Sequence, residues 1–274
     1  MRFITLLLWF FAITSSHVFA GESPWQDHQG MIKTRLVTGS ADMMRQGEAL
    51  LAWEAELAPG WKTYWRSPGE AGLPVRLHAG DDEIEILYPT PERFELFGLQ
   101  TYGYSHKVLL PFYMAAPADD DDLKVRADFM VCKEICVPFE ADYELPSESL
   151  AGETSPHDIR LELWMKRVPA REGDAGAGLE VVGAKVMGVP GHQRVIVDVV
   201  AEGSLSGADL LAEAGPKFHF GAPEMSLMGD GTSARFVLMA MTGKNPEDLR
   251  GQKVRLTFLD GDGHAIDRTI ALEP

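Results

Sequence analysis

Cys132 and Cys136 are the two cysteines of this 274-residue chain, and three residues separate them. Thiols at this spacing can form a disulfide in a tight bend between two strands or across one helical turn. The strand-like residues before Cys132 and the proline at position 138 favour the bend. The pair therefore predicts dithiol–disulfide chemistry.

The spacing does not decide whether such a disulfide is structural or cycles between redox states. Closing a loop of about five residues would stabilise the fold by about 2 kcal/mol, against about 4.7 kcal/mol for a loop of 100 residues. Lys133 favours a thiolate and Glu134 opposes it, so the sequence leaves the pKa of both thiols open. A structural and a cycling disulfide remain equally compatible with the spacing.

The N-terminus has the pattern of an export signal, which bears on the compartment of the cysteines. Arg2 precedes an uncharged apolar run over residues 3–13, and Ala20 ends a cleavage-site pattern. We expect a signal peptide over residues 1–20, a mature chain that starts at Gly21, and a location outside the cytoplasm, where disulfides persist. No later apolar stretch is long enough for a membrane helix, so we expect no membrane span in the mature chain.

The charge balance limits the classes of partner. The chain has 25 basic and 41 acidic residues, a formal net charge of −16. Such a surface repels phosphates, which excludes nucleic acid and anionic membrane surfaces as preferred partners. No glycine-rich phosphate loop or Ser-His-Asp order stands out, and the histidines are scattered, so we expect no cofactor and no histidine-based metal site.

The chain reads as strands, a helical joint, and strands again. Short apolar or alternating runs between Gly, Pro and Asp clusters are typical of antiparallel sandwiches. These runs occupy residues 49–57, 84–88, 108–114, 123–131, 179–182, 194–200, 234–241, 253–259 and 265–272. Ser155 and Pro156 predict the N-cap and first residue of a helix of about three turns that Pro169 ends.

These elements predict an all-β protein of two β-sandwich domains. We place the first domain at residues 21–150, a helix and linker at 151–178, and the second domain at 179–274. Trp61, Tyr64 and Trp65 are expected to pack at a loop or sandwich corner, and Arg66 to pair with Glu70 across that loop.

Four ordered motifs point to a known family. They are residues 60–74 (GWKTYWRSPGEAGLP), 88–93 (YPTPER), 102–111 (YGY followed by VLLP) and 132–138 (CKEICVP). Together they resemble the N-terminal periplasmic domain of the DsbD family of thiol:disulfide interchange proteins. The C-x3-C spacing and the strand-rich second domain are more similar to the ScsB branch, named for suppression of copper sensitivity.

The resemblance implies an immunoglobulin-like domain that carries electrons in the periplasm. Cys132 and Cys136 match the exchanging pair of the family, and Cys136 is the expected attacking thiol. Phe97, Tyr102 and Tyr104 match the aromatic cover that shields the sulfurs in relatives; as core or turn aromatics they would serve packing alone.

The resemblance also implies partners. A membrane electron donor of the DsbD or ScsB type would reduce the pair, and periplasmic thioredoxin-like proteins would be its clients. The sequence has neither the membrane helices nor the C-terminal Cys-x-x-Cys domain of the complete reductase, so we expect the donor to be a separate protein.

Two alternatives stay open beside this probable protein-disulfide reductase component. In the first, reduced Cys132 and Cys136 bind Cu(I), and the protein handles copper or confers copper tolerance. In the second, the disulfide is structural and the protein is a non-catalytic interaction module.

Overall fold

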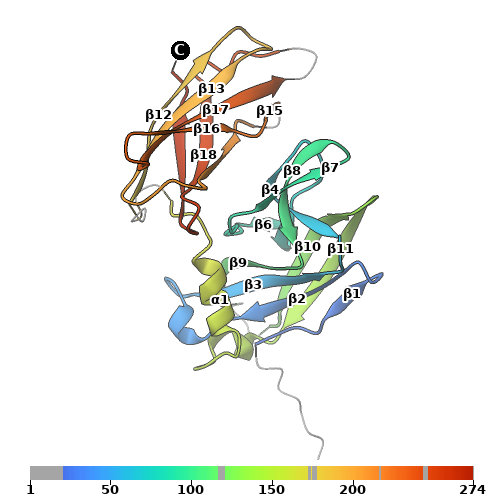
Figure 1. Ribbon diagram of the computed structural model, residues 1–274. Coiled ribbons are helices and arrows are strands. Elements are labelled where there is room, and N and C mark those ends of the chain that lie inside the picture. Colours follow the sequence, from blue (N-terminus) through green and yellow to red (C-terminus); the bar gives the residue numbers. More distant parts are fainter. Residues whose placement is uncertain are drawn as a thin grey trace, which may run out of the picture.

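The computed structural model describes residues 21–116, 121–171, 174, 178–215, 217–242 and 246–273. The predicted signal peptide and most of the predicted linker lie outside these residues. Within them, two β-sandwiches are connected by a short helix (Figure 1). The all-β prediction of two immunoglobulin-like sandwiches joined by a helix is thus confirmed.

The first sandwich consists of two antiparallel sheets. The four-stranded sheet has the order β1-β2-β3-β9, and the seven-stranded sheet has the order β6-β5-β10-β4-β8-β7 with β11 paired to β10. The strands are β1 (Gln26–His28), β2 (Ile32–Thr38), β3 (Glu48–Leu57), β4 (Lys62–Gly69), β5 (Arg76–Ala79), β6 (Asp82–Ile84), β7 (Glu92–Leu96), β8 (Leu99–Ser105), β9 (Lys107–Ala115), β10 (Leu123–Cys132) and β11 (Cys136–Leu145).

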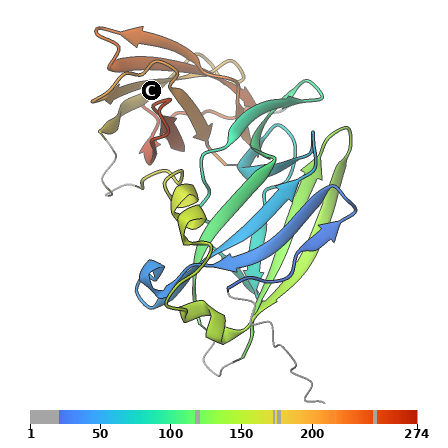
Figure 2. The same ribbon diagram turned by 60° about the horizontal axis from the view of Figure 1, so that its bottom comes forward.

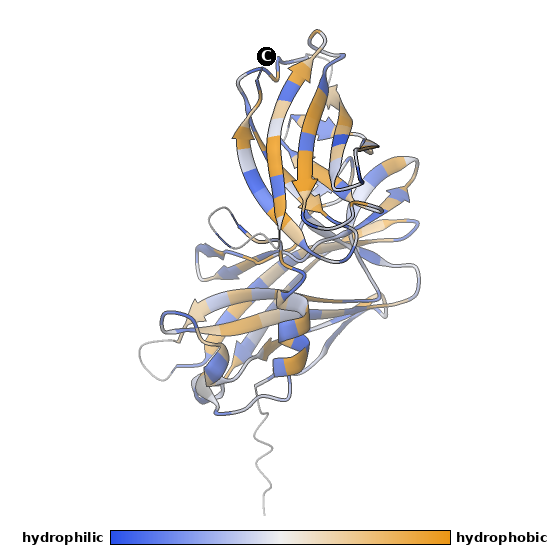
Figure 3. Ribbon diagram, turned by 60° about the vertical axis from the view of Figure 1, so that its left-hand side comes forward, coloured by the Kyte–Doolittle hydropathy of each residue, from blue (hydrophilic) through white to orange (hydrophobic). Residues whose placement is uncertain are grey.

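Alternation along the strands divides the large sheet into a core face and an outer face. In β10, five alternate residues are buried in the main core cluster: Leu123, Val125, Ala127, Phe129 and Val131. Because successive side chains of a strand point to opposite faces, the even-numbered residues of β10 lie on the outer face. Figure 3 shows the same change between apolar and polar residues along other strands of the molecule.

The second sandwich is built in the same way. Its larger sheet has the order β12-β13-β17-β15 with β16 paired to β17, and its smaller sheet has the order β14-β18-β19. The strands are β12 (Leu179–Met187), β13 (Arg194–Ala201), β14 (Asp209–Glu213), β15 (Phe218–Phe220), β16 (Glu224–Met228), β17 (Ser233–Thr242), β18 (Lys253–Leu259) and β19 (Ala265–Ala271). Phe236 and Phe258 meet edge to face in its core, with ring centroids 6.2 Å apart.

The helical joint is shorter than the sequence predicted. The helix α1 covers Asp158–Met165, and two 3-10 turns, η1 (Ala41–Met43) and η2 (Ser147–Ala151), lie before it in the chain. The N-cap is His157, not Ser155: the Ser155 hydroxyl accepts from the His157 amide at 3.1 Å and the Asp158 carboxylate accepts from the Ser155 amide at 3.2 Å, which places Ser155 in the turn two residues before the N-cap. Helix α1 packs beside β9 of the four-stranded sheet (Figure 2). Leu161 is buried there in a cluster with Leu50 and Leu109.

Candidate functional site

Cys132 and Cys136 are joined by a disulfide at the end of a β-hairpin. Cys132 is the last residue of β10 and Cys136 the first of β11, and the two are direct cross-strand partners. Their sulfur atoms are 2.04 Å apart and their Cα atoms 4.1 Å apart. The Lys133 amide donates to the Ile135 carbonyl at 3.0 Å and closes the turn. The predicted bend between two strands is confirmed.

The two cysteines differ in their access to solvent. Cys132 has no exposed surface, whereas Cys136 is exposed. Cys132 lies on the outer face of the sheet, one position after core residue Val131. Cys136 is therefore the more accessible residue of the pair.

A small apolar cluster on the outer face buries Cys132. It consists of Cys132, Tyr64 of β4 and Leu96 of β7, and Phe94 and Met130 pack against it. The Tyr64 and Phe94 ring centroids are 6.2 Å apart. We call Tyr64, Phe94 and Leu96 the cover of Cys132.

The hairpin formed by β7 and β8 supplies two of the three cover residues. Its two-residue turn, Phe97–Gly98, has positive φ at both positions, 55° and 78°, which is the backbone of a type I′ hairpin turn. Phe97 is 65% exposed at the tip of the hairpin. This hairpin leaves the body of the sandwich as a narrow ribbon (Figure 1).

The predicted aromatic cover and the observed one differ in composition. Tyr102 and Tyr104, alternate residues of β8, are buried in the core cluster, a different cluster from that of Cys132. The Tyr104 hydroxyl donates to the Pro89 carbonyl at 2.8 Å, and Tyr102 packs edge to face on Trp65. The motif at residues 102–104 therefore builds the core, because its tyrosines share the face that points inward.

The sequence interpretation missed Phe94 and Leu96. Their i, i+2 spacing places both side chains on one face of β7, a signal that alternation could have provided. It was not recognised because the strand has only five residues, too few for the alternation to stand out.

Two glycines, Gly72 and Gly103, leave space for residues of β4. A Cβ atom on Gly72, whose φ is 98°, would lie 2.3 Å from the Tyr64 ring. A Cβ atom on Gly103 would lie 2.0 Å from the Thr63 carbonyl oxygen. Contacts that short do not occur, so side chains at these two positions would displace β4 or β8 and with them the cover.

Two lysines lie next to the disulfide, one on the neighbouring strand and one in the turn between the cysteines. Lys62 is the cross-strand partner of Cys132 in β4, and its Nζ lies 4.3 Å from the centroid of the Phe94 ring. Lys133 reaches the Pro59 carbonyl at 3.4 Å, and Glu134 is exposed in the turn. A neighbouring ammonium group favours a thiolate once the pair is reduced.

Tyr64 is the polar member of the cover. Burial raises its pKa to about 12, so its hydroxyl keeps its proton at neutral pH. That hydroxyl has no hydrogen-bond partner among the described residues. The cover thus shields Cys132 with one unsatisfied polar group inside it.

An apolar groove lies near the disulfide. It has a volume of about 670 Å³; its apolar lining consists of Leu73, Pro74, Phe129, Pro138 and Phe139, and Arg76, Asp128 and Glu140 line the rest. Pro138 of this groove follows Cys136 by two residues, and the exposed Ile135 directly precedes Cys136. Exposed apolar surface of this kind is suited to contact with another protein.

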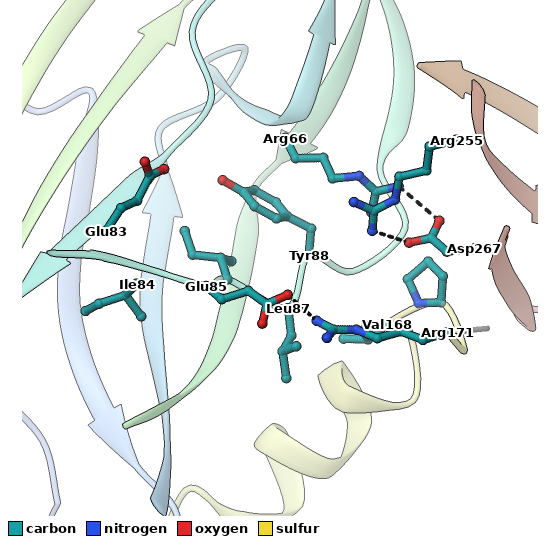
Figure 4. A pocket seen from close by; sticks show the side chains of 12 residues that line it. Arg66, Glu83, Ile84, Glu85, Leu87, Tyr88, Val168, Arg171, Arg255 and Asp267 are labelled. Carbon is teal, nitrogen blue, oxygen red and sulfur yellow. Dashed lines mark hydrogen bonds and ion pairs between the residues drawn. The ribbon is translucent and has the colours of Figure 1, made fainter. Parts of the chain in front are cut away.

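Arg66 does not pair with Glu70 as predicted. It reaches the second domain, where it contacts Glu213 at 2.8 Å. It also contacts Asp267 at 3.0 Å (Figure 4). Glu70 instead accepts a hydrogen bond from the Gln100 amide at 2.8 Å. The prediction considered partners within the loop, and the true partners lie about 150 to 200 residues further along the chain.

No group of three or more His, Cys, Asp or Glu side chains in the described part of the chain is arranged to hold a metal ion. The Cu(I) hypothesis for the cysteine pair stays an untested prediction. Among the same residues, no helix has the length and apolarity needed to cross a membrane.

Comparison with known proteins gives two family matches and a shared fold. Residues 33–148 match the family described as thiol:disulfide interchange protein DsbD, N-terminal, and residues 167–272 match a domain of unknown function, DUF8393. No curated protein matches the chain. Among solved structures, the chain is similar to the N-terminal periplasmic domain of ScsB from Proteus mirabilis, with a TM-score of 0.73 and 18% identity over 93% of this chain and 99% of that chain.

Proposed function

We propose that this protein passes reducing equivalents to client proteins through Cys132 and Cys136, since residues 33–148 match the DsbD N-terminal family. The observation that carries the proposal is the unequal exposure of the two cysteines: Cys136 is exposed and Cys132 is buried beneath the cover. Thiol–disulfide exchange requires that the attacking thiolate reach the sulfur of its partner, and the exposure of Cys136 meets this requirement.

The reaction starts from the reduced pair. The Cys136 thiolate attacks one sulfur of a client disulfide, forms a mixed disulfide, and displaces the other client sulfur as a thiolate. Cys132 then loses its proton and attacks the Cys136 sulfur, which closes the intramolecular disulfide and releases the second client thiolate. Two electrons leave this protein, the client gains them, and the two protons of the original thiols balance the two client thiolates.

Partners follow from the same premise. A membrane electron donor of the DsbD or ScsB type would reverse the reaction on the disulfide, and thioredoxin-like clients would accept the electrons. We place this exchange in the periplasm, since the similar ScsB domain is periplasmic and the N-terminus has an export-signal pattern. The apolar groove and Ile135 provide surface for such partners beside Cys136.

The cover has a part in this cycle. While it is closed, Phe94, Leu96 and Tyr64 keep the Cys132 sulfur from side reactions. Phe97, exposed at the tip of the β7–β8 hairpin, is the cover-loop aromatic that a docking client would meet, and Tyr102 and Tyr104 anchor the base of that hairpin in the core. Movement of the hairpin would open the path for the resolving step.

The test is the reduction potential of the pair in the mature protein, from titration with glutathione or dithiothreitol and mass-tag readout. An exchanging pair has a potential between about −180 and −270 mV, whereas a value below about −300 mV would identify an inert structural bond and overturn the proposal.

Trapping assigns the two sulfurs. Cys132→Ser leaves the exposed thiol and should accumulate a mixed disulfide with an oxidised thioredoxin-like probe. Cys136→Ser, the matched control, leaves only the buried thiol and should trap at least about 100-fold more slowly, since access of the attacking thiolate sets the rate. Equal trapping by both variants would contradict the assigned order of attack.

A further inference from the structure

We propose that the second domain positions the cover of Cys132 through one strand, β14, with Asp209 and Glu213 as positioning residues. The consequence for exchange rests on the function proposed above, but the positioning itself is a property of the folded protein. The argument begins with the two faces of β14.

The side chains of β14 alternate between the two domains. Leu210 is buried in the core of the second domain, and Ala212 packs against that core. Leu211 is 4% exposed and belongs to the core cluster of the first domain. Because Asp209, Leu211 and Glu213 occupy alternate positions, all three point toward the first domain.

Asp209 holds the strand that provides Phe94 and Leu96. Nη2 of Arg93 donates to both carboxylate oxygens of Asp209, at 2.8 and 2.9 Å. Nη1 of Arg93 donates to the Tyr102 hydroxyl at 2.9 Å, which ties the same guanidinium to β8. Arg93 directly precedes Phe94 in β7, so the ion pair acts on the strand adjacent to the cover.

Glu213 holds the strand that provides Tyr64. Nε of Arg66 donates to Glu213 at 2.9 Å, and Nη2 of Arg66 donates to Thr257 at 2.7 Å. The Arg66 side chain is 12% exposed, so these contacts are largely shielded from solvent. Arg66 follows Tyr64 by two residues in β4, and the ion pair therefore fixes the strand that carries Tyr64.

The second domain thus fastens both strands that build the cover. Leu211 fills the first core between the two ion pairs, and each pair restrains a strand within two residues of a cover side chain. Loss of the Asp209 contact frees the β7 end of the cover while Leu211 and Glu213 still hold the domains together. The cover should then open more often without unfolding of either domain.

The experiment measures the exposure of Cys132 directly. In a Cys136→Ser background, Cys132 is the only thiol, and its alkylation rate by N-ethylmaleimide under native conditions reports how often the cover opens. We expect Asp209→Asn to raise this rate by about threefold to tenfold, the range expected for loss of a partly exposed, doubly hydrogen-bonded ion pair.

Asp198→Asn is the matched control. Asp198 forms an equally well-made pair with Arg235, at 2.7 and 2.9 Å, within the second domain. Its substitution should leave the alkylation rate unchanged. Equal rates for Asp209→Asn and Asp198→Asn would overturn the inference.

A double-mutant cycle identifies Arg93 as the partner through which Asp209 acts. Arg93→Gln should raise the rate to a similar degree, and the double variant should be no faster than the faster single variant. Multiplicative effects in the double variant would overturn the inference. None of these rates involves a client or a redox step, so a failure here is distinct from a failure of the proposed function, which the reduction potential decides.

Discussion

The core of the first sandwich and the cover of Cys132 lie on opposite faces of one sheet and are built differently. In the core, Trp53 Nε1 donates to the Tyr143 hydroxyl at 3.0 Å, and that hydroxyl lies 2.6 Å from the Thr34 hydroxyl. The cover is a much smaller cluster; Tyr64 in the cover has a hydroxyl without a partner among the described residues, as Trp65 in the core has an unpartnered Nε1, so the two regions differ chiefly in how many side chains they bury. Breaking the cover therefore costs far less free energy than breaking the core, which permits local opening above an intact sandwich.

The largest effect is expected on the core side of this comparison. Phe112 is fully buried in the core, and Phe112→Ala should lower the free energy of unfolding by about 3–5 kcal/mol through lost burial and a cavity. Urea denaturation measures this loss. Alkylation of Cys132 in the Cys136→Ser background should change little as long as the protein stays folded. A large increase in the alkylation rate under conditions where the variant remains folded would show that the core and the cover open together.

Arg66 should give the next largest effect, because it joins the domains. Arg66→Met removes the buried partner of Glu213 and one partner of Asp267, and we expect a loss of about 3 kcal/mol from carboxylates left without their cation. Asp267 keeps Arg255 and Thr257, which holds the loss near the lower end of the usual range.

The measurement for Arg66→Met is urea denaturation followed by fluorescence, with Arg126→Met as the control. Arg126 forms an exposed pair with Asp142 on the first domain, and its loss should be within about 0.5 kcal/mol of neutral. If the two variants were equally stable, the buried contact would contribute nothing beyond a surface pair, and the fastening of β4 by the second domain would be in doubt.

The core and the cover of Cys132 also differ in how well they could be predicted from the sequence. Long alternating strands were predicted at nearly their observed bounds; residues 123–131 correspond to β10 and residues 253–259 to β18. The cysteine bend followed from the strand before it and the proline after it. Hydrophobic periodicity is strong in such elements, because one whole face is buried.

The cover and the domain interface were not predicted, for physical reasons. Strand β7 is short and largely exposed, so its two apolar side chains gave a weak signal. The partners of Arg66 and Arg93 lie in another domain, and no local pattern reveals a contact across more than 100 residues. Tyr102 and Tyr104 were assigned to the cover by resemblance, but the register of β8 directs them into the core.

A cavity in the cover should have the opposite balance of effects to Phe112→Ala: a smaller loss of stability and a larger increase in the alkylation of Cys132. Leu96→Ala removes a nearly buried side chain from the cluster, and we expect a stability loss of about 2 kcal/mol, at the low end because a surface hairpin can close over the gap. The alkylation rate of Cys132 should rise by about tenfold or more, in keeping with a loss of at least 1.4 kcal/mol from the closed state.

The control for Leu96→Ala lies in the same hairpin. Leu99 is exposed on β8, and Leu99→Ala should change neither the free energy of unfolding nor the alkylation rate by much. Faster alkylation in Leu99→Ala than in Leu96→Ala would mean that the hairpin protects Cys132 by some contact other than the cluster described above.

The smallest expected effect is the pH dependence of stability, which involves a carboxylate at the domain interface and no group in the cover. Burial raises the pKa of Asp267, but the charge of Arg66 and the hydrogen bond from Thr257 outweigh it and hold the pKa below its ordinary value of 3.8. This carboxylate therefore stabilises the folded protein fully above pH 3.8, and the contribution is lost as the pH falls below 3.8 through the lowered folded-state pKa. Tyr64, in the cover, titrates only near pH 12.

Acid should consequently weaken the fastening of β4 to the second domain without a titration inside the cover itself. Many carboxylates titrate below pH 5, so the informative quantity is the difference in free energy of unfolding between the wild type and Asp267→Asn. That difference should be constant from pH 7 to about pH 5 and shrink below pH 3.8, because the protonated aspartic acid then resembles the neutral amide. A difference that stayed constant down to pH 3 would mean that the Asp267 carboxylate contributes no charge-dependent stability, and that Arg66 is held by Glu213 and packing on Trp65 instead.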